Sequence, residues 1–401
     1  MAVAAGLAVA NLYYAQPLLG TLSRSLSVPP GAVATLVTVT QVGYAVGLAF
    51  LVSLGDIWER RRLVSGLLLV TAGSAAGAAL APSLAWLEVA VIALGATSVV
   101  AQILVPLAAD LSGERVRGRV VGTVMTGLLL GILMARTVSG ALAQLAGWRA
   151  VFWLSASLMV GLSVGLRLVL PRSRNATALS YPRVLRSVVM IFAAEPILRR
   201  RSLYGALAFA GFSVFWTTAA FALSGPPYHY GNGVIGLFGL AGVAGAICAS
   251  LAGRLTDRGW ASWTTGGFLA IITGSFGLLV LGGSSLLPFV VGVVLLDLGV
   301  QGIQVTNQGV IYRLRDDARS RINTAYMISY FAGGAAGSAL AGLAWSTTRW
   351  AGVCALGALI GLVGLGVWGK ERLGAGRHRT PRQRRPAVDA GARQEKVQAG
   401  C

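Results

Sequence analysis

Charged side chains are scarce in this chain. Only 11% of its 401 residues are Asp, Glu, Lys or Arg, whereas 55% are hydrophobic. A soluble domain carries about 25% charged residues to keep its surface hydrated, so the composition excludes an ordinary soluble protein and predicts one surrounded by lipid. Lys is nearly absent, and Arg supplies most of the formal net charge of +20. Basic grooves interleaved with aromatic residues are missing, so we expect no nucleic-acid partner.

Histidine and cysteine are also rare. The two histidines, His229 and His378, lie outside the long apolar runs, and no Cys/His set has metal-ligand spacing. The chain has no Walker sequence, which excludes ATP hydrolysis by a P-loop. No Ser-His-Asp set can be assembled from these two histidines. We therefore expect no enzyme, no metal site and no cofactor.

What the chain does contain is a series of apolar runs of about 20 residues, the length that crosses a hydrocarbon core of roughly 30 Å as a helix. They predict an all-α integral membrane protein with twelve transmembrane helices. The first run has no basic segment before it, so we expect a retained span and not a cleaved signal peptide. The runs lie near 2–20, 32–54, 63–81, 87–108, 120–142, 150–170, 203–224, 233–253, 262–281, 287–310, 322–344 and 350–369.

Arginine indicates the orientation, because Lys and Arg concentrate in cytoplasmic loops. With the N-terminus inside, the outer loops hold only Arg24, Arg149 and Arg349, and the inner loops are rich in Arg. We therefore expect a multi-pass protein of the cell (plasma or inner) membrane whose N- and C-termini are both cytoplasmic.

The two halves of the chain repeat. A shift of 202 residues aligns special residues of the first half with identical ones in the second, such as Gly140 with Gly342 and Trp148 with Trp350. A repeat in the same orientation predicts two pseudo-symmetric six-helix bundles and is typical of secondary transporters. The predicted parts are a first bundle at 1–170, a cytoplasmic linker at 171–201, a second bundle at 202–369 and a basic, disordered cytoplasmic tail at 370–401.

Three further features concern helix geometry. Residues 181–194 of the linker can form an amphipathic helix on the inner membrane face, although a solvated tether fits equally well. Pro17 and Pro106 are expected to kink the first and fourth spans. Glycines at four-residue spacing let helix backbones approach closely; they include Gly127 with Gly131 and Gly333 with Gly337. Such seams are where the halves could slide, although tight packing alone would also explain them.

The loops after the second and eighth spans share a pattern of acidic and basic residues. The first contains Asp56, Arg60 and Arg61, and the second contains Asp257 and Arg258. Asp at a helix start is favoured by the helix dipole, and basic neighbours can pair with it to form a latch that exists only when the inner side is closed. A generic juxtamembrane charge cluster would explain one such loop, but two copies in register weaken that explanation.

These loops resemble the inner-loop signature of the major facilitator superfamily, roughly G-x-L-x-D-R-x-G-R-R. The resemblance covers nearly the whole chain and extends to a bacterial branch of drug and sugar efflux permeases, through the segments that begin at Asn11, Gln41 and Phe212. It implies the twelve-helix fold and transport. Ile57 replaces an Arg of the signature, and the motifs of proton antiporters are missing from the fourth and fifth spans. The resemblance therefore supports transport more strongly than proton antiport.

Two ionisable residues lie well inside apolar runs. A charge such as that of Arg136 at the centre of a span costs about 2.5–3.5 kcal/mol on insertion scales, so this side chain should face the interior. There it either attracts an anionic group of a solute or holds the cavity together through carbonyls and helix dipoles. Asp297 lies among apolar neighbours, which favour its protonated form. It is the predicted proton-coupling group.

Uncharged polar side chains form a second candidate set. Amides in hydrocarbon cost several kcal/mol unless they are satisfied, so their helix faces should line a wet cavity, although bonding between helices explains some of them as well. Tyr and Trp beside amides suit a ligand with an apolar body and a few hydrogen-bonding groups. The candidate cavity residues, besides Arg136, are Tyr14, Gln16, Gln41, Tyr44, Gln102, Trp216, Gln301, Gln304 and Asn307.

These observations predict secondary active transport of a small organic solute by alternating access. Proton-coupled efflux of a drug or metabolite is the favoured mode. Two alternatives stay open: an uncoupled facilitator or exchanger of a sugar or metabolite, and a membrane sensor or scaffold that signals through its basic tail. The expected partners are the solute, protons and the lipid bilayer, and we expect a monomer. The sequence does not identify the solute.

Overall fold

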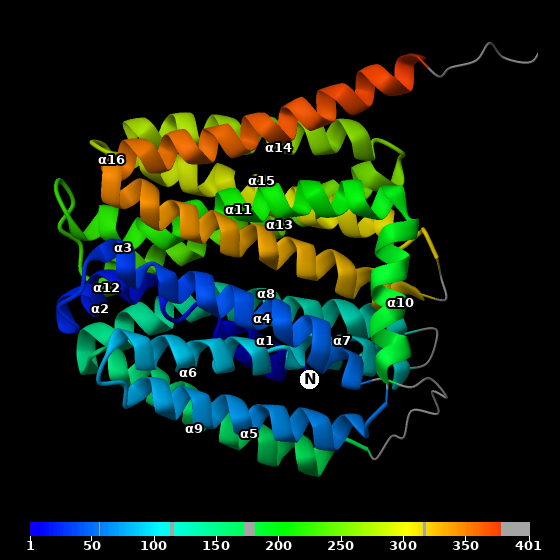
Figure 1. The fold of residues 1–401 in the computed structure, drawn as a ribbon, viewed down its shortest axis with the longest axis horizontal. Coiled ribbons are helices and arrows are strands. Elements are labelled where there is room, and N and C mark those ends of the chain that lie inside the picture. Colours follow the sequence, from blue (N-terminus) through cyan, green and yellow to red (C-terminus); the bar gives the residue numbers. More distant parts are fainter. Residues whose placement is uncertain (56, 113–115, 172–180, 316–317, 378–401) are drawn as a thin grey trace, which may run out of the picture.

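The computed structural model describes the whole chain except residues 56, 113–115, 172–180, 316–317 and 378–401. Every regular element in the described part is a helix. Figure 1 shows two layers of long helices, with the first half of the chain below and the second half above. One helix, α10 (Tyr181–Ala194), stands across both layers at one end.

The first half follows its six predicted spans, three of which are broken into shorter pieces. Its elements are α1 (Ala2–Ala10), the 3-10 turn η1 (Gln16–Leu18), α2 (Leu19–Ser25), α3 (Pro30–Val33), α4 (Thr35–Leu54), α5 (Arg60–Ala79), α6 (Leu84–Thr97), α7 (Val100–Asp110), α8 (Arg117–Ala146) and α9 (Trp148–Val169).

The second half repeats this plan. Its last two predicted spans are two helices that meet at Arg349, where the non-helical backbone (φ 55°, ψ −142°) turns the chain; the label α16 covers both. That element reaches Arg377, beyond the predicted start of the tail at 370. The helices are α11 (Pro196–Ser224), α12 (Asn232–Leu237), η2 (Phe238–Ala241), α13 (Gly242–Asp257), α14 (Ala261–Leu281), α15 (Leu286–Ile311) and α16 (Arg319–Arg377).

Nine stretches of the described chain are long and apolar enough to cross a membrane, and one of them, Arg319–Leu373, covers the last two predicted spans. The first and eighth predicted spans are absent from this set because their helical pieces are too short, such as α1 with 9 residues and α13 with 16. The prediction of an all-α membrane chain in two similar bundles is therefore confirmed.

The two predicted proline kinks lie in different surroundings. Pro17 lies in η1, where the first span is interrupted. Pro106 lies inside α7 and does not end it, so a kink at this residue stays a prediction. The fourth span breaks at Ser98, whose hydroxyl donates to the carbonyl of Leu94 at 2.6 Å. A serine that bonds back to the preceding turn competes with the helical ladder and bends the helix.

The glycine seams lie inside each half. Gly131 of α8 faces Gly6 of α1 so closely that a Cβ would collide with the backbone of that residue, and Gly337 of α16 faces Ala210 of α11 in the same way. Backbones that touch like this pack by van der Waals contact without intervening side chains. These two seams lie within one bundle each, which favours tight packing inside the bundles over sliding between the halves.

Several helix crossings join the halves at one end of the molecule. We call the end that carries α10 and the last residues of α4 and α15 the linker end, and the opposite end, with α2, α3 and α12, the far end (Figure 1). At the far end α2 packs on α11, α3 on α16 and α12 on α8, while α4 runs along α16. The far end is therefore closed in this structure.

The amphipathic helix predicted in the linker is present. It spans Tyr181–Ala194 and buries Val184, Val188 and Ile191 against its neighbours, which are α4 in the first half and α11 and α16 in the second. The hydroxyl of Tyr181 donates to the carbonyl of Phe50 at 3.0 Å. Residues 181–194 are thus a packed helix that touches both halves and not a solvated tether.

Candidate functional site

Arg136 of α8 and Asp297 of α15 meet at the boundary between the halves. Their side chains are 1% and 3% exposed, and both line one cavity of about 20 Å³. In the described chain no ion pair within 4.0 Å joins them. The only two ionisable residues that the sequence places deep inside spans are thus brought to one site, one from each bundle.

Aromatic rings and an amide hold the guanidinium of Arg136. Its Nε donates to Oε1 of Gln16 at 2.7 Å, and its carbon lies 3.9 Å from the ring centre of Trp216, 4.8 Å from that of Tyr13 and 5.3 Å from that of Phe212. A desolvated cation over an aromatic face gains about 2 kcal/mol. The Nη2 atom is buried and has no partner among the described residues. The cation is therefore fixed in place with one donor still available to a ligand.

Asp297 is held by the same tryptophan. Nε1 of Trp216 donates to Oδ1 of Asp297 at 3.2 Å, so this one indole touches both opposite charges. A Cβ at Gly242 would lie 3.3 Å from Oδ2 of Asp297, which leaves space only for a small residue there. Gln301 lies about one helical turn beyond Asp297 on α15 and lines the same cavity.

Two candidate residues, Gln41 of α4 and Gln102 of α7, each form a hydrogen bond with a residue of the other half. Gln41 donates to the hydroxyl of Ser213 on α11 at 3.1 Å. Gln102 donates to the hydroxyl of Tyr44 at 3.4 Å and accepts from the amide of Asn323 at 3.5 Å. Each of these bonds satisfies a polar group that would otherwise be costly in an apolar setting. In this state these side chains join helices and do not line the central cavity.

The candidates nearer the linker end of α15 are engaged inside the second half. Gln304 accepts from the hydroxyl of Tyr326 at 2.7 Å. Asn307 donates to that hydroxyl at 3.3 Å and to the carbonyl of Arg201 at 3.1 Å. In the first half, the carbonyl of Tyr14 accepts from Ser139 at 2.6 Å. Of the candidate set, Gln16, Arg136, Trp216, Asp297 and Gln301 therefore gather at the centre.

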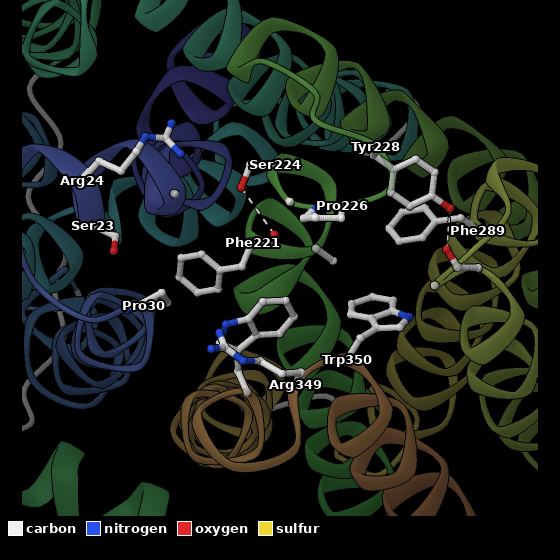
Figure 2. A pocket seen from close by; sticks show the side chains of 16 residues that line it. Ser23, Arg24, Pro30, Phe221, Ser224, Pro226, Tyr228, Phe289, Arg349 and Trp350 are labelled. Carbon is white, nitrogen blue, oxygen red and sulfur yellow. Dashed lines mark hydrogen bonds between the residues drawn. The ribbon is translucent and has the colours of Figure 1, made fainter.

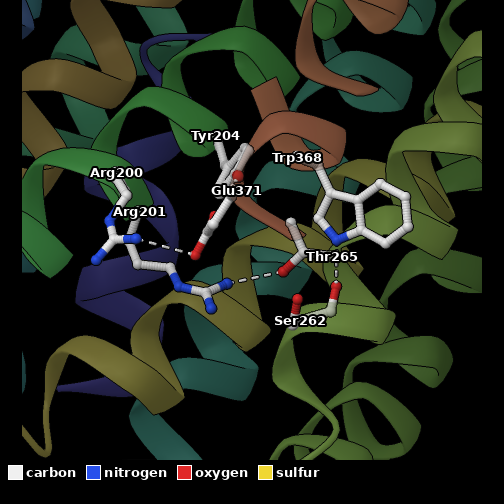
Figure 3. Close-up of polar contacts among 7 residues, drawn as sticks. All are labelled: Arg200, Arg201, Tyr204, Ser262, Thr265, Trp368 and Glu371. Carbon is white, nitrogen blue, oxygen red and sulfur yellow. Dashed lines mark hydrogen bonds and ion pairs between the residues drawn. The ribbon is translucent and has the colours of Figure 1, made fainter. Parts of the chain in front are cut away.

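A polar cluster that the sequence analysis missed lies at the start of α11 (Figure 3). Arg201, which is 9% exposed, donates to the hydroxyl of Thr265 at 2.7 Å. Arg200 pairs with Glu371 at 3.3 Å, and the hydroxyl of Tyr204 donates to the same carboxylate at 2.6 Å. In the sequence, Arg201 is the last residue of the predicted linker at 171–201. The cluster ties α11 to α14 and to the end of α16.

The acidic and basic loops pair within each half. Arg60 contacts Asp110 at 2.6 Å in the first half, and Asp257 contacts Arg313 at 2.6 Å in the second. Asp56, the other predicted latch residue, lies outside the described residues. These two ion pairs join helix ends of one bundle, so neither of them bridges the halves.

Two more of the predicted gating residues are basic side chains at helix ends. Arg61 lies in the first turn of α5 and is half-buried. Arg258 follows the last residue of α13 and is exposed.

A larger cavity of about 580 Å³ opens at the far end, between residues of both halves (Figure 2). No candidate residue lines it, and sequence analysis did not foresee it. Its aromatic and basic lining comes from helix ends and loops that are far apart in the chain, so no single motif marks it.

Comparison with known proteins agrees with this architecture. Residues 1–338 match the model of the Major Facilitator Superfamily. A protein of Escherichia coli O157:H7 named "Uncharacterized transporter YgaY" is 50% identical over 368 residues, which cover 92% of this chain and 93% of the relative. "Probable transporter SCO4007" of Streptomyces coelicolor is 36% identical over 364 residues, with 89% and 83% covered.

A solved structure shows the same fold at low sequence identity. The crystal structure of a bacterial homolog of the human lysosomal transporter Spinster, in an inward-facing and occupied conformation, matches with a TM-score of 0.71 at 14% identity. The match covers 94% of this chain and 95% of that one. The family match, the transporter relatives and the fold agree: this chain belongs to the Major Facilitator Superfamily and is a multi-pass membrane transporter, not an enzyme.

Proposed function

We propose that this transporter moves a small organic solute by alternating access and exchanges it for protons at Asp297. The observation that carries the proposal is the central site, where a buried cation of one bundle and a buried carboxylate of the other share a cavity without touching. Two opposite charges held apart in a low-dielectric interior favour a ligand that reaches both.

The solute that fits has an acceptor group at one end and a donor group at the other. The acceptor, such as a carboxylate, would bind the free Nη2 of Arg136, and the donor would bind the carboxylate of Asp297. An apolar body would lie against Trp216 and Phe212, which already surround the guanidinium. Charge-assisted hydrogen bonds of this kind are about twice as strong as neutral ones.

Competition at Asp297 supplies the coupling. The ionised carboxylate accepts the donor group of the solute, whereas the protonated one no longer attracts it. A proton that arrives at Asp297 therefore weakens solute binding, and a solute that binds keeps the proton away. This reciprocity is the thermodynamic requirement for exchange.

The closed far end supports the proposed cycle. A cavity of about 20 Å³ holds little more than one water molecule, so the solute binds only when the halves separate. We place the linker end in the cytoplasm because the arginine-rich loops end there. The far end then faces outside, and opening at the linker end admits the solute for efflux.

The loop ion pairs take a supporting role in this mechanism. Arg60 with Asp110 and Asp257 with Arg313 each join helix ends inside one bundle. Such pairs keep a bundle rigid while it rocks. A cytoplasmic latch between the halves stays a prediction for Asp56, and a monomeric state stays a prediction as well.

The proposal is tested by transport in proteoliposomes, after a pooled toxicity and uptake screen in overexpressing cells has supplied a transported solute. We expect wild-type flux to respond to a pH gradient. Asp297→Asn should abolish that response while solute exchange continues. Asp110→Asn, which changes a carboxylate with 57% of its side chain exposed, is the matched control and should keep it. Flux that a pH gradient still drives in Asp297→Asn would contradict the coupling role, and wild-type flux that follows only the solute gradient would favour an uncoupled facilitator.

A further inference from the structure

The far-end cavity is a vestibule built by both halves. Its volume of about 580 Å³ lies within the range of small-molecule sites, roughly 300–1,000 Å³. Figure 2 shows Arg24 and Ser23 of the first half on one side and Tyr228, Phe289 and Trp350 of the second half on the other. None of its lining residues is Asp or Glu.

Arginines from opposite halves give the vestibule its charge. Arg24 of α2 and Arg349 at the bend of α16 both line it, and neither makes an ion pair within the described chain. The third arginine predicted in these loops, Arg149, is engaged elsewhere, because it donates to the carbonyl of Ala81 at 3.1 Å and lies 4.2 Å from the ring centre of Trp148. The vestibule is therefore positively charged.

Arg349 is placed there by an unusual backbone. Its φ of 55° lies in the left-handed region that glycine adopts freely and other residues rarely do. This conformation turns the chain between the two long segments of α16. An arginine occupies the turn, and its side chain lines the mouth of the vestibule.

Aromatic rings form the apolar wall. Trp350 stacks on Phe289 with ring centres 5.5 Å apart, and Tyr228 meets the edge of Phe289 at 5.8 Å. Burial, with a smaller contribution from Tyr230, raises the pKa of Tyr228, so its hydroxyl stays neutral and donates to the carbonyl of Gly282. The wall adds flat apolar surface and no negative charge.

A single buried ring separates this wall from the central site. Phe215 lies 5.7 Å from Phe289 on the vestibule side and 5.1 Å from Trp216 on the central side, measured between ring centres. Phe215 itself is fully buried. The vestibule is therefore the compartment next to the central cavity on the far side.

We propose that the vestibule is a second binding site, which takes an aromatic organic anion. The positive charges of Arg24 and Arg349 attract the anionic group, and the ring packs against Trp350 and Tyr228, which line the cavity and are partly exposed. Because the far end is closed between the halves, the site is accessible from that side while the central site is not. The idea that the transported solute passes through this site rests on the proposed function. Anion binding rests only on the residues that line the vestibule.

Binding can be measured on the full-length protein in lipid nanodiscs with 2-naphthoate as the probe and quenching of tryptophan fluorescence as the signal. We expect saturable binding that exceeds that of 2-naphthylmethylamine and 2-naphthylmethanol, which share the ring but lack the carboxylate. Arg24→Gln and Arg349→Gln should each weaken binding about fivefold, the upper value for exposed charge pairs. Arg349→Lys should retain most of the affinity. Arg149→Gln is the matched control and should leave it unchanged.

Two further variants separate the vestibule from the central site. Arg136→Gln and Asp297→Asn should retain naphthoate binding, because neither residue lines the vestibule. Loss of binding in Arg136→Gln together with full binding in the Arg24→Gln/Arg349→Gln double variant would assign the anion to the central site and overturn the proposal. Equal binding of the amine and the carboxylate would also overturn it. The proton-coupling proposal is tested by a different measurement: it fails if a pH gradient still drives solute flux in Asp297→Asn.

Discussion

Replacing Gly140 with valine should keep the far end of the transporter from closing. A Cβ at Gly140 of α8 would collide with the carbonyl oxygen of Asn232 and would lie 3.1 Å from Cα of Gly236, both on α12 in the other half. The internal repeat relates Gly140 to Gly342 of α16, which faces Gly31 of α3 where these two helices cross at the far end. A Cβ added at Gly342 would lie 3.3 Å from the carbonyl oxygen of Gly31. Two glycines thus allow two of the three crossings that close the far end, α12 on α8 and α3 on α16.

The size of the effect follows from these contacts. Non-bonded heavy atoms pack best about 3.5–4.0 Å apart, and the carbonyl oxygen of Asn232 is the closest atom to the added Cβ, so α12 must retreat by at least about 1 Å to accept a side chain at Gly140. Overpacking of this kind costs about 1–3 kcal/mol. Only the state closed at the far end bears this cost, so the population should shift about 5–150-fold towards the open state.

Cysteine labelling measures the shift. Ile235 of α12 is 4% exposed at this crossing, so Ile235→Cys, in a background without the native cysteines, should react slowly with a membrane-impermeant maleimide. Gly140→Val should speed the reaction strongly, and Gly342→Ala should do so weakly, because its nearest contact, 3.2 Å from the added Cβ, is less severe. Gly122→Val is the control on the same helix, where an added Cβ meets nothing within 4 Å. Unchanged labelling in Gly140→Val would refute the reasoning.

Three further outcomes are expected. Arg136→Lys should keep the fold but reduce solute affinity about tenfold or more, as measured by flux at rising solute concentration, because an ammonium group cannot replace the planar guanidinium donors. Reversing only one charge of the pair Asp257 and Arg313, whose side chains are 72% and 61% exposed, should lower thermal stability by at most about 1 kcal/mol, and reversing both should restore it. Tyr181→Phe should loosen α10, seen as faster hydrogen exchange of its amides, because the bond to Phe50 is lost. Burial raises the pKa of Tyr181, so the stabilisation from the neutral hydroxyl is complete below pH about 10 and is lost only as the pH rises through the higher folded-state pKa.

The polar residues inside the spans could be found from the sequence, but their roles could not. An Arg or an Asp within an apolar run stands out in the sequence, because placing a charge inside a membrane span costs free energy. That Arg136 and Asp297 share one cavity depends on the rotation of α8 and α15 about their own axes. The amide of Gln41 is as conspicuous in the sequence as that of Gln16, yet it bonds Ser213 across the seam while Gln16 holds the central cation.

Sequence by itself determined the helical spans and the duplicated halves, because hydropathy and helical periodicity are sums over neighbouring residues, but it left the linker as either an amphipathic helix or a solvated tether. Tertiary structure alone decided that Asp257 pairs with Arg313 inside one bundle, that the fourth span breaks at Ser98, and that Arg24 and Arg349 share a vestibule. Such choices depend on how helices from distant parts of the chain fit against one another. The packing energy depends on contacts between residues that are distant in the sequence, so it cannot be worked out from any local stretch of the chain.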